Sequence, residues 1–146
     1  MDYSKLTKKE LVRLLQLRET PKIANTPQTI ADYLSPWSCA QQEYFLAVLL
    51  DGAHHVANIV EVSKGLVNKT LVHPRELFAP ALEQRATAIV VAHNHPSGEL
   101  EPSEDDIATT RRLRKAGAIL GIEILDHIIF SKGNYRSMLE SGEFDC

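Results

Sequence analysis

The hydrophobic positions of this chain first follow a helical period. Leucines three and four residues apart predict a helix over residues 7–17, with Thr7 as its cap and Glu10 as the capping-box partner. A second, shorter helix is predicted over residues 27–33, because it begins with a proline, which suits a first helical turn. We therefore expect a short helical N-terminal arm over residues 1–38, followed by one main domain.

The pattern then changes to that of alternating strands and helices. Two apolar runs, 44–50 and 55–62, are predicted to form a hairpin through the turn signal Asp51-Gly52, and a short strand is predicted near 69–72. The run 86–92 is continuously apolar and rich in β-branched residues, which favours a strand buried on both faces. The other predicted elements are helices from Pro74 to about Gln84 and from Ser103 to about Leu120, and strands over 122–130 and 135–139. This alternation predicts an α/β fold in which helices flank a mixed sheet.

Composition narrows the class of protein. The chain has 146 residues, 44% of them hydrophobic and 24% charged, which is typical of one globular domain. The formal net charge of −3 lacks the basic excess of a dedicated nucleic-acid binder. Cys39 and Cys146 form no CxxC pair, so no disulfide framework or thiolate metal site is indicated. The apolar runs are too short for a membrane span, and the charged N-terminus does not resemble a secretory signal, so we expect a cytoplasmic protein.

The polar segment after the buried strand carries the candidate chemistry. Its sequence is His-Asn-His-Pro-Ser-Gly, beginning at His93. In an extended backbone, residues two apart share a face, so His93 and His95 can direct two imidazoles at one point. Asp106 falls in the first turn of the next predicted helix, where the chain can return a carboxylate to them. Two nitrogens and one oxygen, with a fourth position left to water, form the ligand set of a catalytic zinc site.

Each of these residues also has a structural interpretation. Ser103 and Asp106 fit a capping box at a helix start, and an isolated His-x-His pair is usually a hydrogen-bonded or surface feature. The combination of both features in one short segment has few accidental matches, and the two interpretations are compatible. The other histidines, His54, His55 and His73, are expected to be solvated or structural.

Two further groups of residues leave alternatives open. Asp126-His127 lies in an apolar strand, where it fits a satisfied core pair, or a pair that orients a metal ligand from outside the ligand set. The basic run at Arg111, Arg112, Arg114 and Lys115 is expected to be a solvated helix face, with contact to nucleic acid or an acidic partner as the alternative.

The string His-x-His-Pro-x6-Ser-x2-Asp resembles the JAMM motif of MPN+ metalloproteins. It maps onto His93, His95, Pro96, Ser103 and Asp106. The finer form His-Asn-His-Pro-Ser-Gly resembles the RadC-like branch of that family. The likeness implies a zinc-dependent hydrolase that holds one zinc ion per chain through the two histidines and the aspartate.

The resemblance extends over roughly residues 42–144, including segments 72–76 and 125–127. It implies an MPN/JAMM-type domain, similar in fold to cytidine deaminases, over residues 39–146. Glu43 stands where the family has a glutamate that takes a proton from the zinc-bound water and returns it to the leaving nitrogen; on its residue type alone, it is a solvated charge at a strand start.

By the same resemblance, Ser103 donates a hydrogen bond to the oxyanion of the reaction. The implied substrate is an amide bond in a peptide or an isopeptide.

Three other functions compete with this interpretation. A RadC-like domain is also associated with DNA repair and recombination, as a non-catalytic or accessory module. In that family the N-terminal part often resembles a helix-hairpin-helix region, but residues 1–38 contain no Gly-rich hairpin. A nucleobase deaminase would need His-x-Glu followed by Pro-Cys-x-x-Cys, which this chain lacks. An inactive scaffold would normally show broken ligands, and all three are present.

Overall fold

The computed structural model describes residues 7–10, 26–65 and 72–144. The strand predicted near 69–72 falls outside these residues except for Val72, which is not in a strand. Most of the helix predicted over 7–17 also falls outside them, but Thr7 and Glu10 exchange the two hydrogen bonds of a capping box. The elements are α2 (Pro27–Tyr33), the 3-10 helix η2 (Ser35–Trp37), β1 (Tyr44–Leu50), β2 (Val56–Lys64), α3 (Pro74–Glu83), β3 (Ala88–Asn94), α4 (Glu104–Leu120), β4 (Glu123–Ser131) and β5 (Asn134–Ser137).

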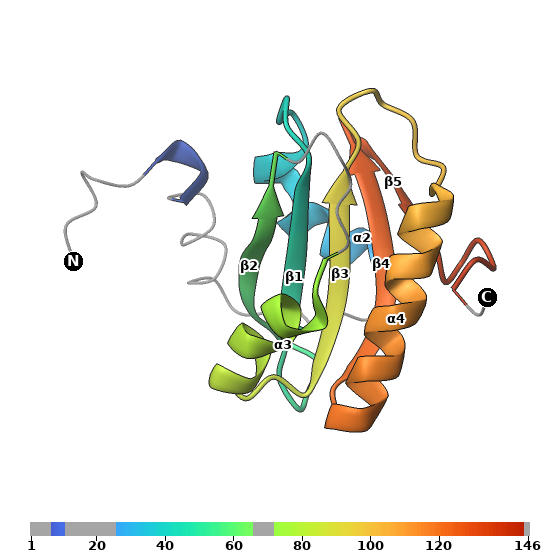
Figure 1. Cartoon of the computed structure of the whole chain (residues 1–146). Coiled ribbons are helices and arrows are strands. Elements are labelled where there is room, and N and C mark those ends of the chain that lie inside the picture. The colour runs from blue at the N-terminus through green and yellow to red at the C-terminus, as the bar shows by residue number, and fades with distance from the viewer. Residues whose placement is uncertain (1–6, 11–25, 66–71, 145–146) are drawn as a thin grey trace.

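The strands form one mixed sheet in the order β2-β1-β3-β4-β5 (Figure 1). β1 runs antiparallel to both β2 and β3, and β4 runs antiparallel to β5. β3 and β4 are parallel, with α4 as the crossover between them. The predicted α/β fold with a mixed sheet flanked by helices is confirmed.

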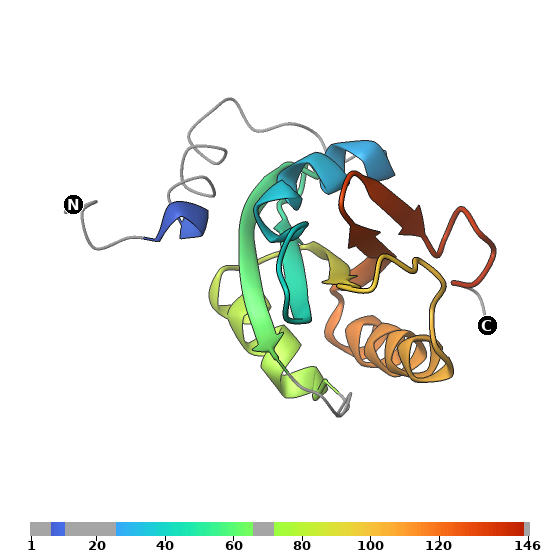
Figure 2. The ribbon, with the colours of Figure 1, turned by 90° about the horizontal axis from the view of Figure 1, so that it is seen from above.

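Helices cover both faces of the sheet. α2 and η2 lie on one face, and α3 and α4 lie on the other (Figures 1 and 2). β1 shows why the sheet is buried on both sides: Leu46 and Leu50 pack against α2 and η2, while Ala47 and Leu49 pack toward α3 and α4. All seven residues of β3 are buried, as its continuous apolar run predicts.

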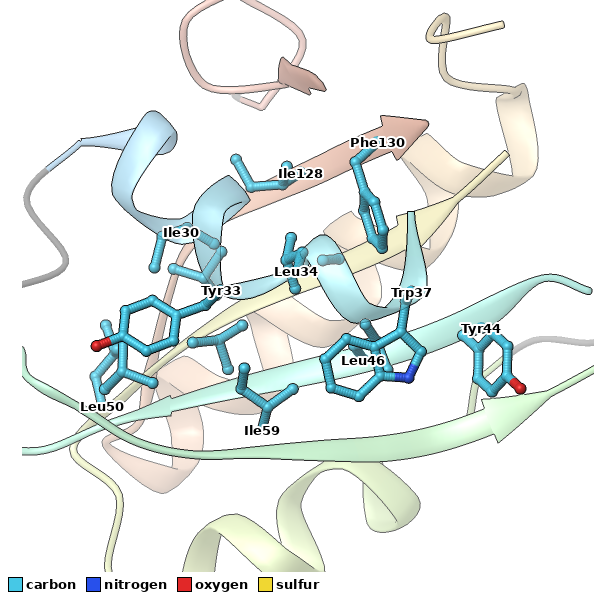
Figure 3. Close-up of a cluster of buried hydrophobic side chains, with 14 of the residues drawn as sticks. Ile30, Tyr33, Leu34, Trp37, Tyr44, Leu46, Leu50, Ile59, Ile128 and Phe130 are labelled. Atoms are coloured by element: carbon cyan, nitrogen blue, oxygen red, sulfur yellow. The ribbon is translucent and has the colours of Figure 1, made fainter. Parts of the chain in front are cut away.

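The N-terminal segments contribute directly to one of these cores. Ile30 and Tyr33 of α2, Trp37 of η2 and Leu34 between the two helices pack onto the sheet, where Leu34 and Trp37 are fully buried (Figure 3). Lys9 also contacts this side of the molecule. Its Nζ lies 2.6 Å from Glu61 Oε1 and 4.0 Å from the centre of the Tyr44 ring. Within the part of the chain that the structure describes, no helix is long and apolar enough to cross a membrane.

The end of α4 is shaped by two glycines. A Cβ at Gly117 would lie 2.3 Å from the carbonyl oxygen of Ile122, so only glycine lets β4 begin this close to the helix. Gly121 ends the helix in the left-handed conformation, with φ of 75°. The chain therefore turns sharply from α4 into β4, which then runs parallel to β3.

This topology brings three segment ends to one edge of the sheet. The carboxyl ends of β3 and β4 lie at that edge because the two strands are parallel. The amino end of β1 lies there too, because β1 is antiparallel to β3. α4 begins just beyond the same edge, after the loop that leaves β3 (Figure 1). The candidate residues His93, His95 and Asp106 are all in or next to these ends.

Candidate metal centre

The two motif histidines lie side by side at the end of β3. Both are buried, and their Nε2 atoms are 2.7 Å apart. His93 is the penultimate residue of β3, and the Phe45 ring from the neighbouring β1 stacks on its imidazole with an angle of 7° between the planes. The predicted strand ended at Ala92, but the ladder continues through His93 and Asn94 because both still pair with β4. The extended backbone thus holds the two imidazoles together, as the i, i+2 spacing predicts.

Asp106 closes the group from the first turn of α4. Its Oδ2 lies 3.4 Å from His93 Nε2 and 3.6 Å from His95 Nε2. The predicted capping box is also confirmed: Ser103 N–H donates to Asp106 Oδ2 at 2.8 Å, and Asp106 N–H donates to Ser103 Oγ at 3.1 Å. The same carboxylate oxygen therefore caps the helix and faces the imidazoles.

The surroundings keep Asp106 ionised. Burial alone would raise the pKa of this carboxyl, but the adjacent imidazoles of His93 and His95 hold its pKa well below the usual range. A negatively charged oxygen beside two imidazole nitrogens is an arrangement that attracts a cation.

The other ring nitrogen of His95 fixes how that side chain is protonated. His95 Nδ1 lies 2.7 Å from the carbonyl oxygen of Glu99, which can only accept a hydrogen bond. Nδ1 therefore carries a proton, and Nε2 is the nitrogen that can bind a metal ion. Gly98 makes this contact possible because its positive φ of 90° turns the loop back toward His95.

Asn94, between the two histidines, points to the opposite face of the sheet. Its Oδ1 accepts from the Tyr44 N–H at 2.7 Å, and its Nδ2 donates to the Gln42 carbonyl at 2.9 Å. These bonds hold the backbone on both sides of Glu43. Phe45 pairs with His93 in the sheet register, so the half-buried Glu43, two residues earlier, starts from the same face as the imidazoles. The role of Glu43 stays a prediction.

His127 belongs to this neighbourhood, and sequence reasoning gave it only as an alternative. It is fully buried in β4, and its Nε2 lies 2.7 Å from His93 Nδ1. Burial lowers the pKa of His127 well below its ordinary value, so the ring is neutral.

Asp126, the neighbour of His127 in sequence, behaves differently. Its carboxylate accepts hydrogen bonds from the Ser137 hydroxyl and from the backbone N–H groups of His127 and Leu139. Asp126 therefore fits the interpretation as a satisfied core residue, whereas the ring of His127 contacts a candidate ligand.

The remaining histidines are used elsewhere. His54 is exposed in the turn after β1, and His55 lies 3.5 Å from Asp51 in the same turn, at the opposite end of β1 from His93. His73 is exposed at the start of α3 and lies 3.4 Å from Arg112. Cys39 is an exposed free thiol.

The donor set fits a divalent metal ion. Among the residues that the structure describes, His93, His95 and Asp106 form the one group of three or more potential ligands with its ligand atoms within 4.8 Å of one another. Imidazole nitrogens and a carboxylate oxygen suit zinc, and three protein ligands leave a fourth position open. The structure thus defines an α/β domain with a candidate His2Asp metal centre at the edge of its sheet.

Comparison with known proteins places this domain in a family. The chain belongs to the RadC-like JAB domain family, whose model matches residues 24–143. The resemblance to RadC-like proteins that the motif indicated is therefore confirmed.

Curated relatives match most of the chain. A UPF0758 protein of Pelobacter propionicus is 46% identical over 118 residues, which cover 80% of this chain and 52% of the relative. A UPF0758 protein of Geobacter sulfurreducens is 47% identical over 70% of this chain and 44% of the relative. One from Staphylococcus aureus is 45% identical over 82% of this chain and 55% of the relative. The chain spans about half the length of the curated relatives it matches.

Proposed function

We propose that this domain is a zinc-dependent hydrolase of amide bonds in peptides or isopeptides. The observation that carries the proposal is the convergence of His93 Nε2, His95 Nε2 and Asp106 Oδ2 on one buried point. Membership of the JAB family supports it, because the motif of that family maps onto these same three residues.

The three residues would hold the ion, and the ion would supply Lewis acidity toward a carbonyl oxygen and make a water molecule more acidic. Glu43 would take the proton from that water and return it to the leaving nitrogen. The Asn94 side chain supports this role, because it fixes the backbone at Gln42 and Tyr44, on either side of Glu43.

Ser103 would stabilise the negative charge that develops on the carbonyl oxygen of the substrate when water attacks it. Its Oγ accepts from the Asp106 N–H, so the hydroxyl is held at the helix start beside the candidate ligands. Its own proton would be donated to the developing oxyanion. One such donor contributes about 3 kcal/mol to transition-state stabilisation in well-studied enzymes.

The test is a metal count on the full chain. The protein, purified without a histidine tag and offered zinc, should carry about one zinc ion per chain by elemental mass spectrometry, as a three-ligand catalytic site requires. His95→Ala should lose it. His55→Ala is the matched control, because this histidine lies in the β1–β2 turn, at the far end of β1. A wild-type chain without zinc, or a His95→Ala chain that keeps a tight zinc ion, would contradict the proposed centre.

A further inference from the structure

A line of hydrogen bonds runs from His93 back to the helix that carries Asp106. His93 Nδ1 lies 2.7 Å from His127 Nε2, and His127 Nδ1 lies 2.5 Å from Thr110 Oγ1. Thr110 Oγ1 in turn lies 2.7 Å from the carbonyl oxygen of Asp106. These contacts link β3, β4 and α4, and they end on the backbone of a candidate ligand.

The donor and the acceptor of each hydrogen bond can be assigned by starting from the carbonyl oxygen of Asp106. A carbonyl oxygen only accepts, so the single hydroxyl proton of Thr110 is donated to Asp106, as is common four residues along a helix. The other neighbour of this hydroxyl, Met138 Sδ at 3.9 Å, is a weaker acceptor. Thr110 Oγ1 must therefore accept from His127, which places the proton of His127 on Nδ1.

The same logic then fixes His93. Because the ring proton of the fully buried His127 is used on Nδ1 toward Thr110, its Nε2 is left to accept a hydrogen bond. His93 Nδ1 must be the donor in this pair. The proton of His93 is then held away from the ligand cluster, and its Nε2 lone pair faces Asp106 and His95.

We infer that His127 and Thr110 are positioning residues for metal binding, which fix His93 in the tautomer that presents Nε2 to the ion. This inference rests on the proposed zinc centre. The tautomer of His95 is fixed in the same way by a single backbone acceptor, the Glu99 carbonyl. His93 Nδ1 faces the side chain of His127 instead, so its tautomer depends on side chains from two other elements, β4 and α4. Hydrogen-bonding partners of this kind fix the tautomer and orientation of metal-binding histidines generally.

The two imidazoles in this line of hydrogen bonds are shielded from solvent. His127 is fully buried and His93 nearly so. The Phe45 ring stacks on His93 and meets His127 edge-on, with ring centres 6.3 and 5.7 Å away. A reversed line of bonds would put the proton of His93 on Nε2, which would block the metal position.

The first experiment reads the tautomers in the metal-free full chain. Nitrogen-15 NMR of the imidazole rings should show the proton of His127 on Nδ1 and none on Nε2, with Nδ1 of His93 protonated. Free histidine favours the opposite, Nε2-protonated form, so the expected signature differs from that of an unrestrained ring. A proton on His127 Nε2 would overturn the inference.

The second experiment measures zinc affinity by competition with a chelator. Thr110→Val is nearly isosteric but removes the acceptor of His127, and it should weaken zinc binding by about 10- to 100-fold, in the range found for such supporting residues. It should also move the His127 proton to Nε2. Thr110→Ser keeps the hydroxyl and should bind zinc within about 3-fold of wild type, well short of such a loss. A Thr110→Val protein with wild-type affinity and wild-type tautomers would refute the assignment.

Variants of His127 itself provide a rescue test. His127→Leu should lose affinity to a similar extent, whereas His127→Gln, whose amide oxygen can accept from His93 Nδ1, should recover part of it. Asp126→Asn is the matched control, because its side chain accepts from the Ser137 hydroxyl and from backbone N–H groups, including that of His127, but from no imidazole ring, so it should leave zinc affinity unchanged. Equal losses in the leucine and glutamine variants, or a comparable loss in Asp126→Asn, would indicate a packing role and count against the inference.

These outcomes separate the inference from the proposed function. A chain that binds no zinc overturns the proposed function, and with it the purpose of the line of bonds, even when the tautomers are as expected. A chain that binds zinc with His127 protonated on Nε2 overturns only the inference.

Discussion

The side chain of Asn94 accepts a hydrogen bond of 2.7 Å from the backbone N–H of Tyr44. The residue between the two candidate histidine ligands thus fixes the start of the neighbouring strand. Its amide also donates to the Gln42 carbonyl, so both backbone neighbours of Glu43 are held by one side chain. The His-Asn-His sequence therefore serves both faces of the sheet, with the imidazoles on the α4 side and the amide on the α2 side.

Asn94→Ala should separate these two functions. It leaves a buried Tyr44 N–H without its acceptor, so the free energy of unfolding should fall by about 1–3 kcal/mol. Zinc stoichiometry should be kept, while hydrolysis falls because Glu43 is no longer held. Chemical denaturation and metal analysis measure the two effects. Gln28→Ala, which removes an exposed hydrogen bond to Asp32 in α2, is the control and should change stability by about 0.5 kcal/mol or less. Loss of zinc from Asn94→Ala would contradict this division of roles.

Glu43→Gln should keep zinc and lose hydrolysis. The amide cannot accept the proton of a water molecule, and loss of a general base lowers rates by roughly 10²- to 10⁴-fold. The measurement is peptide and isopeptide cleavage by zinc-loaded protein, with zinc content measured in parallel. Glu83→Gln, an exposed residue at the end of α3, is the control and should be as active as wild type. An active Glu43→Gln protein would remove Glu43 from the mechanism.

Asp126 should make stability depend on pH in an unusual direction. Burial raises the pKa of this carboxyl, and hydrogen bonds from Ser137, Leu139 and His127 offset only part of the rise. The folded chain then binds more protons than the unfolded chain between the ordinary pKa of 3.8 and the raised value. The contribution of Asp126 to stability should therefore fall as pH rises through this window.

The comparison of wild type with Asp126→Asn isolates this effect. The free energy of unfolding, measured at several pH values from about 3.5 upward to span the ordinary carboxyl pKa, should decline for wild type relative to the variant. The difference should level off once the carboxyl is ionised in both states. A wild-type chain that gains stability relative to Asp126→Asn over this window would show the pKa to be lowered instead.

Lys9→Ala should weaken the contact between the segment 7–10 and the main domain. The ammonium group pairs with Glu61 and lies over the Tyr44 ring, and Trp37 Nε1–H donates to the same Glu61 oxygen at 2.9 Å. Trp37 is the one tryptophan of the chain and lies beside Tyr44 in Figure 3, so its fluorescence reports on this contact directly. The emission should shift, and stability should fall by about 1 kcal/mol or less. The exposed neighbour Lys8, changed to alanine, should leave the emission unchanged. The same emission from Lys9→Ala and wild type would show that the contact does not form in solution.

Much of the fold follows from local sequence patterns. The strand predicted over 44–50 is β1, because an unbroken apolar run of this length is buried on both faces of a sheet. The helix predicted over 27–33 is α2, with Thr26 accepting from Thr29 N–H at its start. The candidate ligands are also local, because all of them lie in one segment from the end of β3 to the first turn of α4.

The position of His127 beside His93 could not be predicted from local sequence patterns. Val90 pairs with Asp126 although its neighbour Ile89 pairs with Ile124, so a bulge at Leu125 shifts the register between β3 and β4. This shift determines which of Asp126 and His127 shares a face with His93. Register between distant strands depends on tertiary packing, and the apolar pattern around these two residues does not encode it.

The shared oxygen of Asp106 has a consequence for the dynamics of α4. Asp106 Oδ2 accepts from Ser103 N–H and also faces both imidazoles, so a cation that binds there needs the first helical turn to be formed. Binding that requires a formed turn makes its opening rarer, because the two equilibria are thermodynamically linked. The amide hydrogens of this turn should then exchange more slowly with solvent when the centre is loaded. Hydrogen exchange at the start of α4 thus reports whether the centre holds an ion, and the measurement needs no substrate.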